Sequence, residues 1–215
     1  MGHRVRLGLV LFCLAVLGLL ATQVLVHGPM LELDQAASLW FATHRHALLT
    51  RAMLLVSELH RTAQVLAAAA MLALGLLWRG QRRSALALLV VPTGMLLNAA
   101  LKESFRRLRP GIEDPLVQLA SYSFPSGHAV ASTVFYGMAC ALVFAHVRSR
   151  AWRTLAASVA VAMVLVVTFS RVYLGAHYPS DVVAGVAVGT ICVVLFLRLL
   201  PRGAAPGTDV ARPPP

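Results

Sequence analysis

Long apolar runs alternate with short polar stretches along almost the whole chain. An α-helix needs roughly 20 consecutive apolar residues to cross the hydrocarbon core of a bilayer, and somewhat shorter runs are tolerated. The pattern therefore predicts an all-α integral membrane protein, a bundle of six transmembrane helices. The expected spans are Leu7–Val26, Thr62–Trp78, Ser84–Leu101, Ala129–Val147, Trp152–Phe169 and Val182–Leu200.

The segments outside these spans complete the predicted organisation. Arg4 and Arg6 precede the first run as in a signal peptide, but the run is long and no clear small-residue cleavage site follows, which favours a retained span. Residues 31–49, LELDQAASLWFATHRHALL, show near-helical apolar spacing, which predicts an interfacial helix between the first two spans. We expect one membrane domain over residues 1–202 and a disordered, Pro- and Gly-rich tail over residues 203–215.

Composition favours the membrane class over a nucleic-acid-binding one. Of the residues, 59% are hydrophobic and 13% are charged, whereas about a quarter are charged in a soluble domain. The net charge is +11, but the arginines are scattered between apolar segments instead of forming one basic stripe. We therefore expect membrane lipids and no nucleic acid as partners, and the sequence leaves the oligomeric state open.

Charge in the loops predicts the orientation. Six spans place both termini on one side, and the loops on that side carry more basic residues than the opposite loops. The positive-inside rule then predicts a multi-pass protein of the cell membrane with both termini in the cytoplasm. The excess is small because the stretch LKESFRRLRP, residues 101–110, adds four basic residues to the outer side. Binding of an anion on the outer face would explain this cluster.

Within that cluster, six residues separate Lys102 from the pair Arg109-Pro110. Lysine offers a mobile point charge, and arginine offers a planar fork that matches phosphate oxygens. Taken alone, the stretch is equally well explained by basic side chains that reach from the span end to the membrane surface.

A second stretch, SFPSGHAVAS at residues 123–132, opens the fourth span. Ser126 is a favourable helix N-cap, and Gly127 allows a ligand to approach the backbone closely. Free N–H groups at the helix start would then bind an anion, with His128 beside it. An ordinary capped helix with an incidental histidine is the alternative for this stretch alone.

A third stretch, SRVYLGAHYPSD at residues 170–181, precedes the last span. His177 and Asp181 are four residues apart, so a helical turn that begins near His177 places both on one face. A carboxylate bonded to one imidazole nitrogen fixes the tautomer and leaves the other nitrogen as a nucleophile. A surface contact between the two residues is the alternative.

The predicted topology places all three stretches on the same, outer side. If each stretch had only the alternative explanation given for it above, there would be no reason for all three to lie on one side. Together they resemble the three signature motifs of the type 2 phosphatidic acid phosphatase superfamily. That family includes lipid phosphate phosphatases and bacterial undecaprenyl-diphosphate phosphatases. The motif positions are Lys102, Arg109, Pro110, Pro125, Ser126, Gly127, His128, Ser170, Arg171, His177 and Asp181.

The resemblance implies the role of each residue. His177 attacks phosphorus and forms a phosphohistidine, Asp181 orients it, and His128 protonates the leaving oxygen and later activates water. The phosphate oxygens are held by Lys102, Arg109, Ser126, Gly127 and Arg171. The family needs no metal and no other cofactor.

The implied function is that of a membrane phosphatase acting on a lipid phosphate or diphosphate on the extracytoplasmic face. Undecaprenyl diphosphate, phosphatidic acid and phosphatidylglycerophosphate all fit, and similarity to small bacterial members favours a polyprenyl diphosphate. A lipid phosphotransferase that uses the same site, or a non-catalytic lipid-binding membrane protein, are the alternatives.

Overall fold

The computed structural model describes residues 2–112, 116, 117 and 119–200, and these residues form helices without strands. The predicted tail at residues 203–215 lies outside the described residues. The helices are α1 (His3–Leu25), α2 (Met30–Thr43), α3 (Ala47–Leu59), α4 (Thr62–Trp78), α5 (Arg82–Ala87), α6 (Val90–Phe105), α7 (Gly127–His146), α8 (Arg150–Tyr173) and α9 (Pro179–Phe196), followed by the 3₁₀-helix η1 (Leu197–Leu199).

The predicted all-α membrane bundle is confirmed, with two interruptions of its spans. In the described part of the chain, five helical stretches are long and apolar enough to cross a membrane, and the pair α3 and α4, bent by 52°, is a sixth if the two helices are counted as one broken span. The third span is divided into α5 and α6 near Leu88. Pro92 explains this division, because it lacks the N–H that would bond to the Leu88 carbonyl in a continuous helix.

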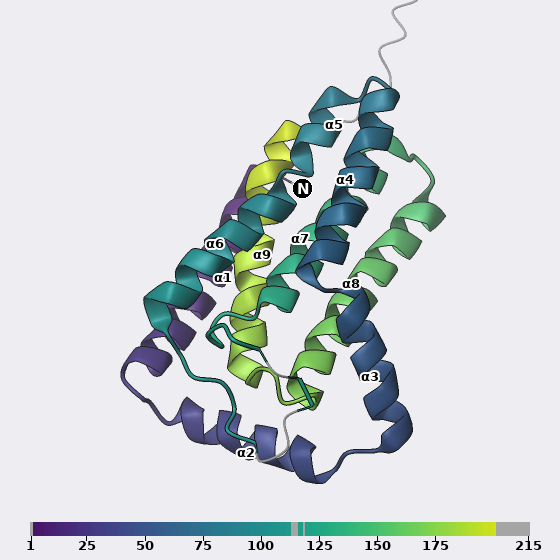
Figure 1. The fold of residues 1–215 in the computed structure, drawn as a ribbon. Coiled ribbons are helices and arrows are strands. Elements are labelled where there is room, and N and C mark those ends of the chain that lie inside the picture. Colours follow the sequence, from purple (N-terminus) through teal and green to yellow (C-terminus); the bar gives the residue numbers. More distant parts are fainter. Residues whose placement is uncertain (1, 113–115, 118, 201–215) are drawn as a thin grey trace, which may run out of the picture.

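The segment between the first two spans differs in detail from its prediction. We expected one interfacial helix over residues 31–49, and the structure has α2 and α3, separated at residues 44–46. α2 lies across one end of the bundle, at the bottom of Figure 1, and α5 lies at the opposite end. The break lets α3 turn upward along α8 and continue into α4.

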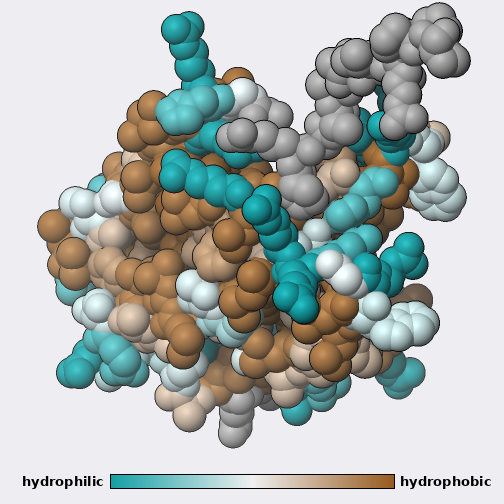
Figure 2. All heavy atoms as spheres, turned by 90° about the horizontal axis from the view of Figure 1, so that it is seen from above, coloured by the Kyte–Doolittle hydropathy of each residue, from teal (hydrophilic) through white to brown (hydrophobic). Residues whose placement is uncertain are grey.

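α7 is the central helix of the bundle and packs against α4, α6, α8 and α9 (Figure 1). Its side chains Val130, Val134 and Met138 are fully buried. Most large exposed side chains of the outer helices are instead hydrophobic, as expected for a surface that faces lipid tails. Figure 2 looks onto the α5 end, where hydrophilic side chains project from a largely hydrophobic body.

Glycine brings α9 into close contact with the start of α7. A Cβ atom at Gly185 would lie 2.7 Å from the Ala129 Cβ and 2.7 Å from the Ser126 carbonyl oxygen. Because one of these neighbours is backbone, rotation of a side chain cannot relieve the overlap. Gly185 therefore sets the distance between α9 and the segment that carries Ser126.

Substitution Gly185→Ala should lower thermal stability, since the added methyl group forces the two helices apart at a cost of about 1–3 kcal/mol. The melting temperature of detergent-purified protein measures the effect. Gly75→Ala in α4 is the matched control, because a Cβ there meets no atom within 4 Å. Equal melting temperatures for both variants would contradict this account of the packing.

Candidate active site

The structure brings the three sequence motifs together at the end of the bundle where α2 lies (Figure 1). Lys102 is in the last turn of α6, and Arg109 lies in the following loop. His128 is in the first turn of α7, Arg171 is in the last turn of α8, and Asp181 is in the first turn of α9. Five separate segments thus contribute to one cluster.

His177 and Asp181 form the predicted pair at the start of α9. Pro179 is the first residue of this helix, and the Asp181 Oδ2 accepts a 2.9 Å hydrogen bond from the Tyr178 N–H. This bond holds the carboxylate toward the loop that carries His177, whose Nδ1 lies 3.5 Å from the same oxygen. Both side chains are almost completely buried, at 2% and 0% exposure.

Arg109 determines which nitrogen of His177 carries a lone pair. Its Nη1 lies 3.2 Å from the His177 Nε2. A guanidinium can only donate, so Nε2 accepts and the proton of a neutral imidazole lies on Nδ1, facing Asp181. Burial lowers the pKa of His177 from 6.5 to about 3, although the bond to Asp181 opposes this effect. The imidazole is therefore neutral at physiological pH, with an unprotonated Nε2.

Backbone carbonyls of the loop before α7 position two of the cations. The Arg109 Nε donates to the Ser121 carbonyl at 2.7 Å and its Nη2 to the Tyr122 carbonyl at 3.2 Å. The Lys102 Nζ donates to the Ser123 carbonyl at 3.3 Å. Burial lowers the pKa of Arg109, whereas the charge of Asp181 raises it. The positive charges of Lys102, Arg109 and Arg171 act on one another, so the three cations lie near each other.

Ser126 occupies the predicted N-cap position of α7, but its side chain forms no capping hydrogen bond. Its buried Oγ has no partner among the described residues, and the same holds for the Nε and Nη2 of Arg171. Buried polar groups are normally paired. These atoms, with the N–H groups at the start of α7, are donors suited to an anion such as phosphate.

A cavity of about 590 Å³ reaches His128 and Arg171 from the break between α3 and α4. Ser57 near the end of α3 contacts both residues: its carbonyl oxygen lies 3.2 Å from the His128 Nε2, and its hydroxyl accepts from the Arg171 Nη1. Most of the remaining wall is apolar, including Leu54 and Leu116. His177 is buried and does not line this cavity.

Arg107 is an important residue that sequence reasoning did not identify. Its Nη1 donates to the Asp181 Oδ1 at 2.7 Å and to the Ser180 Oγ at 2.7 Å, and its Nη2 donates to the Asp34 Oδ2 at 2.8 Å. Asp34 in α2 also accepts from the Ser180 N–H at 3.0 Å. All four residues are buried. The sequence signal was the position of Arg107 within the basic cluster, two residues before Arg109, but its partners lie far away in the chain.

Ser123 is a second residue that the sequence did not indicate. Its hydroxyl donates to the Asp181 Oδ2 and lies 3.4 Å from the His177 Nδ1, while its carbonyl accepts from Lys102. Among the described residues no group of three His, Cys, Asp or Glu side chains is arranged to hold a metal ion.

The fold and the site define a multi-pass helical membrane protein with a buried His–Asp pair surrounded by cations. Residues 83–204 match the PAP2 superfamily. The chain belongs to this superfamily, which confirms the resemblance inferred from the three motifs.

Two curated relatives are named as lipid phosphatases. Phosphatidylglycerophosphatase B of Bacillus subtilis is 36% identical over 111 residues, which cover 51% of this chain and 54% of the relative. Lipid A 1-phosphatase of Rhizobium johnstonii is 36% identical over 138 residues, which cover 57% and 52%. The chain thus spans about half the length of the curated relatives it matches.

Two solved structures share the fold. The crystal structure of a transmembrane PAP2-type phosphatidylglycerolphosphate phosphatase from Bacillus subtilis has a TM-score of 0.76 and 28% identity, covering 90% of this chain and 94% of that one. The structure of Aquifex aeolicus LpxE has a TM-score of 0.58 and 25% identity, covering 78% and 94%.

Substitution Arg107→Gln should lower kcat on the order of 100-fold with little change in KM, because Asp181 and His177 lose their fixed orientation. Steady-state phosphatase kinetics measure the effect, and Arg107→Lys should recover part of it. Arg106→Gln is the matched control. The neighbouring Arg106 is exposed, and its side chain contacts Glu103 instead of Asp181. If the Arg107→Gln variant folds and keeps the wild-type kcat, Arg107 does not position Asp181 and His177 for catalysis.

Proposed function

We propose that this protein hydrolyses the phosphate group of a membrane lipid through a phosphohistidine intermediate. The observation that carries the proposal is the geometry of His177: a neutral imidazole whose Nδ1 faces Asp181 and whose Nε2 points toward Arg109. This is the arrangement of an oriented nucleophile beside a phosphate-binding cation. The names of the two relatives support the same reaction class.

In the first step, the His177 Nε2 attacks phosphorus and the bond between phosphorus and the lipid oxygen breaks. Lys102, Arg109 and Arg171, with the Ser126 hydroxyl and the Gly127 N–H, stabilise the negative charge that develops on the phosphoryl oxygens. Protonated His128 gives its Nε2 proton to the leaving lipid oxygen. Asp181 stabilises the positive charge that His177 acquires.

In the second step, water attacks the phosphohistidine. His128, now neutral, accepts a proton from this water, the phosphorus–nitrogen bond breaks, and His177 returns to its neutral form. Inorganic phosphate leaves and His128 is protonated for the next turnover. The chain supplies nucleophile, acid–base group and charge stabilisation without a metal ion, so we propose metal-independent hydrolysis.

The cavity favours an amphiphilic substrate. It opens at the break between α3 and α4, and apolar side chains from α3 and the loop before α7 line it. A lipid can place its head group at His128 and Arg171 while its tail stays between helices. We propose phosphatidylglycerophosphate as the first candidate, because one relative is named as a phosphatidylglycerophosphatase, and phosphatidic acid as the second. The polyprenyl diphosphate favoured by the sequence finds no support in these names.

Purified protein should release inorganic phosphate from a panel of lipid phosphates, fastest from phosphatidylglycerophosphate, in the presence of a chelator. His177→Ala should reduce release at least about 1,000-fold, since it removes the nucleophile. Labelled donor lipid distinguishes hydrolysis from transfer to a second lipid. Activity that is lost in chelator and restored by magnesium, or a fully active His177→Ala variant, would overturn the mechanism.

We further propose that the active-site end faces the outside of the cytoplasmic membrane and that both termini lie in the cytoplasm. The distribution of basic residues supports this orientation. It would expose the ends of α2 and α6 to the outer aqueous phase. It would place α5 and the loop between α7 and α8 in the cytoplasm.

Single cysteines test this orientation in a variant that lacks Cys13, Cys140 and Cys192. Cysteines at the exposed positions His44 and Glu103 should react in intact cells with a thiol reagent that does not cross membranes. Cysteines at the exposed positions Arg82 and Arg148 should react only after lysis. The reverse pattern would place the chemistry in the cytoplasm.

A further inference from the structure

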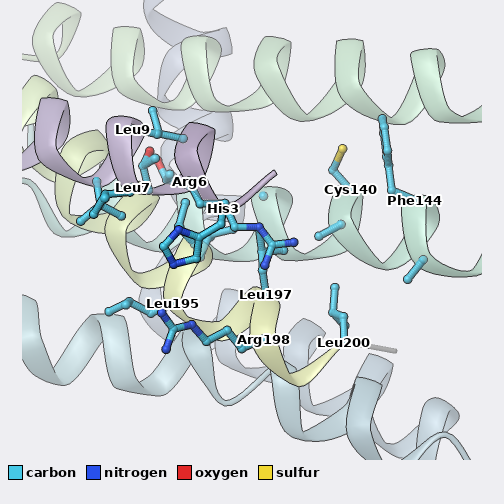
Figure 3. A pocket seen from close by; sticks show the side chains of 18 of the residues that line it. His3, Arg6, Leu7, Leu9, Cys140, Phe144, Leu195, Leu197, Arg198 and Leu200 are labelled. Atoms are coloured by element: carbon cyan, nitrogen blue, oxygen red, sulfur yellow. The ribbon is translucent and has the colours of Figure 1, made fainter. Parts of the chain in front are cut away.

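A second cavity, of about 1480 Å³, lies away from the active-site residues. It is a groove bounded by α1, α7, α9 and the start of η1, shown in Figure 3. α1 packs along α9, so the space between α1 and α7 remains open. None of Lys102, Arg109, His128, Arg171 and His177 lines it.

The groove has the length of one membrane leaflet. Along α7 it extends from Thr133 to Ala145, which at 1.5 Å per residue is about 18 Å. Half of the hydrocarbon core is about 15 Å thick. Apolar side chains such as Leu7, Val10 and Leu195 form most of its wall. The groove therefore fits an acyl chain that belongs to the leaflet opposite the active site.

Basic residues gather at the groove. His3, Arg6, Arg153 and Arg198 all line it, and Figure 3 shows His3, Arg6 and Arg198 around the same space. The Arg6 Nε is buried without a hydrogen-bond partner among the described residues. Arg153 donates to the carbonyls of Val147 and Phe144, at 2.7 and 2.9 Å, and its guanidinium lies 5.5 Å from the centre of the Phe144 ring, so these partners carry no negative charge.

The described part of the chain offers these arginines no carboxylate. Its acidic residues belong to α2, to the ends of α3 and α6, and to the first turn of α9, all at the active-site end. No salt bridge joins Arg6, Arg153 or Arg198 to a described residue. Within the described ranges, no group at this end of the bundle therefore supplies the complementary negative charge.

We propose that this groove binds an anionic phospholipid of the leaflet opposite the active site. One acyl chain lies on the apolar wall, and the phosphodiester lies among Arg6, Arg153 and Arg198. The occupant is a bound lipid and not a substrate, since the groove lacks the nucleophile and acid of the active site. The inference is independent of the proposed phosphatase activity and of which compartment this face meets.

Phosphatidylglycerol is a suitable probe because it is anionic and carries a phosphodiester. Binding to the full-length protein is followed by native mass spectrometry and by the melting temperature in mixed micelles, with phosphatidylcholine of the same acyl chains as the neutral reference. Phosphatidylglycerol should bind more tightly and raise the melting temperature more. The double variant Arg6→Gln/Arg198→Gln should weaken its binding on the order of 10-fold, since each basic residue contributes to anionic-lipid attraction.

Arg82→Gln/Arg83→Gln is the matched control, because it removes two exposed arginines from α5 at the same end of the bundle. It should leave phosphatidylglycerol binding unchanged. Arg6→Lys/Arg198→Lys keeps the charge and should retain most of the binding. This variant provides the test if the glutamine variant does not fold. Equal loss in the control, or equal binding of the two lipids, would overturn the proposal. Phosphate release by each variant is measured separately, so a failure of the phosphatase assignment does not affect the result.

Discussion

The rest of the active site depends on one buried carboxylate. Asp181 is completely buried, and a buried charge without compensation costs several kcal/mol. Compensation comes from four directions: the Ser123 hydroxyl, the Tyr178 N–H, the Arg107 guanidinium and the His177 imidazole. Arg107 and Ser123 lie near the two ends of the connection between α6 and α7, and Tyr178 and His177 lie in the loop before α9. Burial of this one charge therefore joins the connection between α6 and α7 to the start of α9, two segments that are distant in sequence.

The same network extends to the interfacial helix. Arg107 joins Asp181 to Asp34, and Asp34 also accepts from the N–H and hydroxyl of Ser180. One guanidinium between two carboxylates leaves the group with one net negative charge, which the two neighbouring cations Lys102 and Arg109 more than offset. α2 is thus a structural part of the site, although none of its residues belongs to the three motifs.

Much of the architecture could be predicted because it depends on local patterns. The length of the apolar runs predicts the membrane spans, and the spacing of the motif residues predicts which ends of those spans hold the candidate active-site residues. The His177–Asp181 contact follows from a separation of four residues at a helix start. The network of Arg107 and Asp34 could not be predicted in this way, because it joins residues 73 positions apart through tertiary structure. The division of the predicted interfacial helix and the role of Ser57 likewise depend on how α3 packs on α8.

The bend between α3 and α4 explains how a buried site can serve a lipid. Ser57 lies just before the bend and contacts the Nε2 of His128 through its carbonyl oxygen and the Nη1 of Arg171 through its hydroxyl oxygen. Phosphate oxygens are stronger acceptors for a guanidinium than a neutral hydroxyl. An arriving head group therefore replaces the two bonds to Ser57 while it also fills the unpaired Nε and Nη2 of Arg171, and departing phosphate lets Ser57 return to its partners. This exchange limits the net free energy of phosphate binding. A product held by three cations can consequently still leave the site.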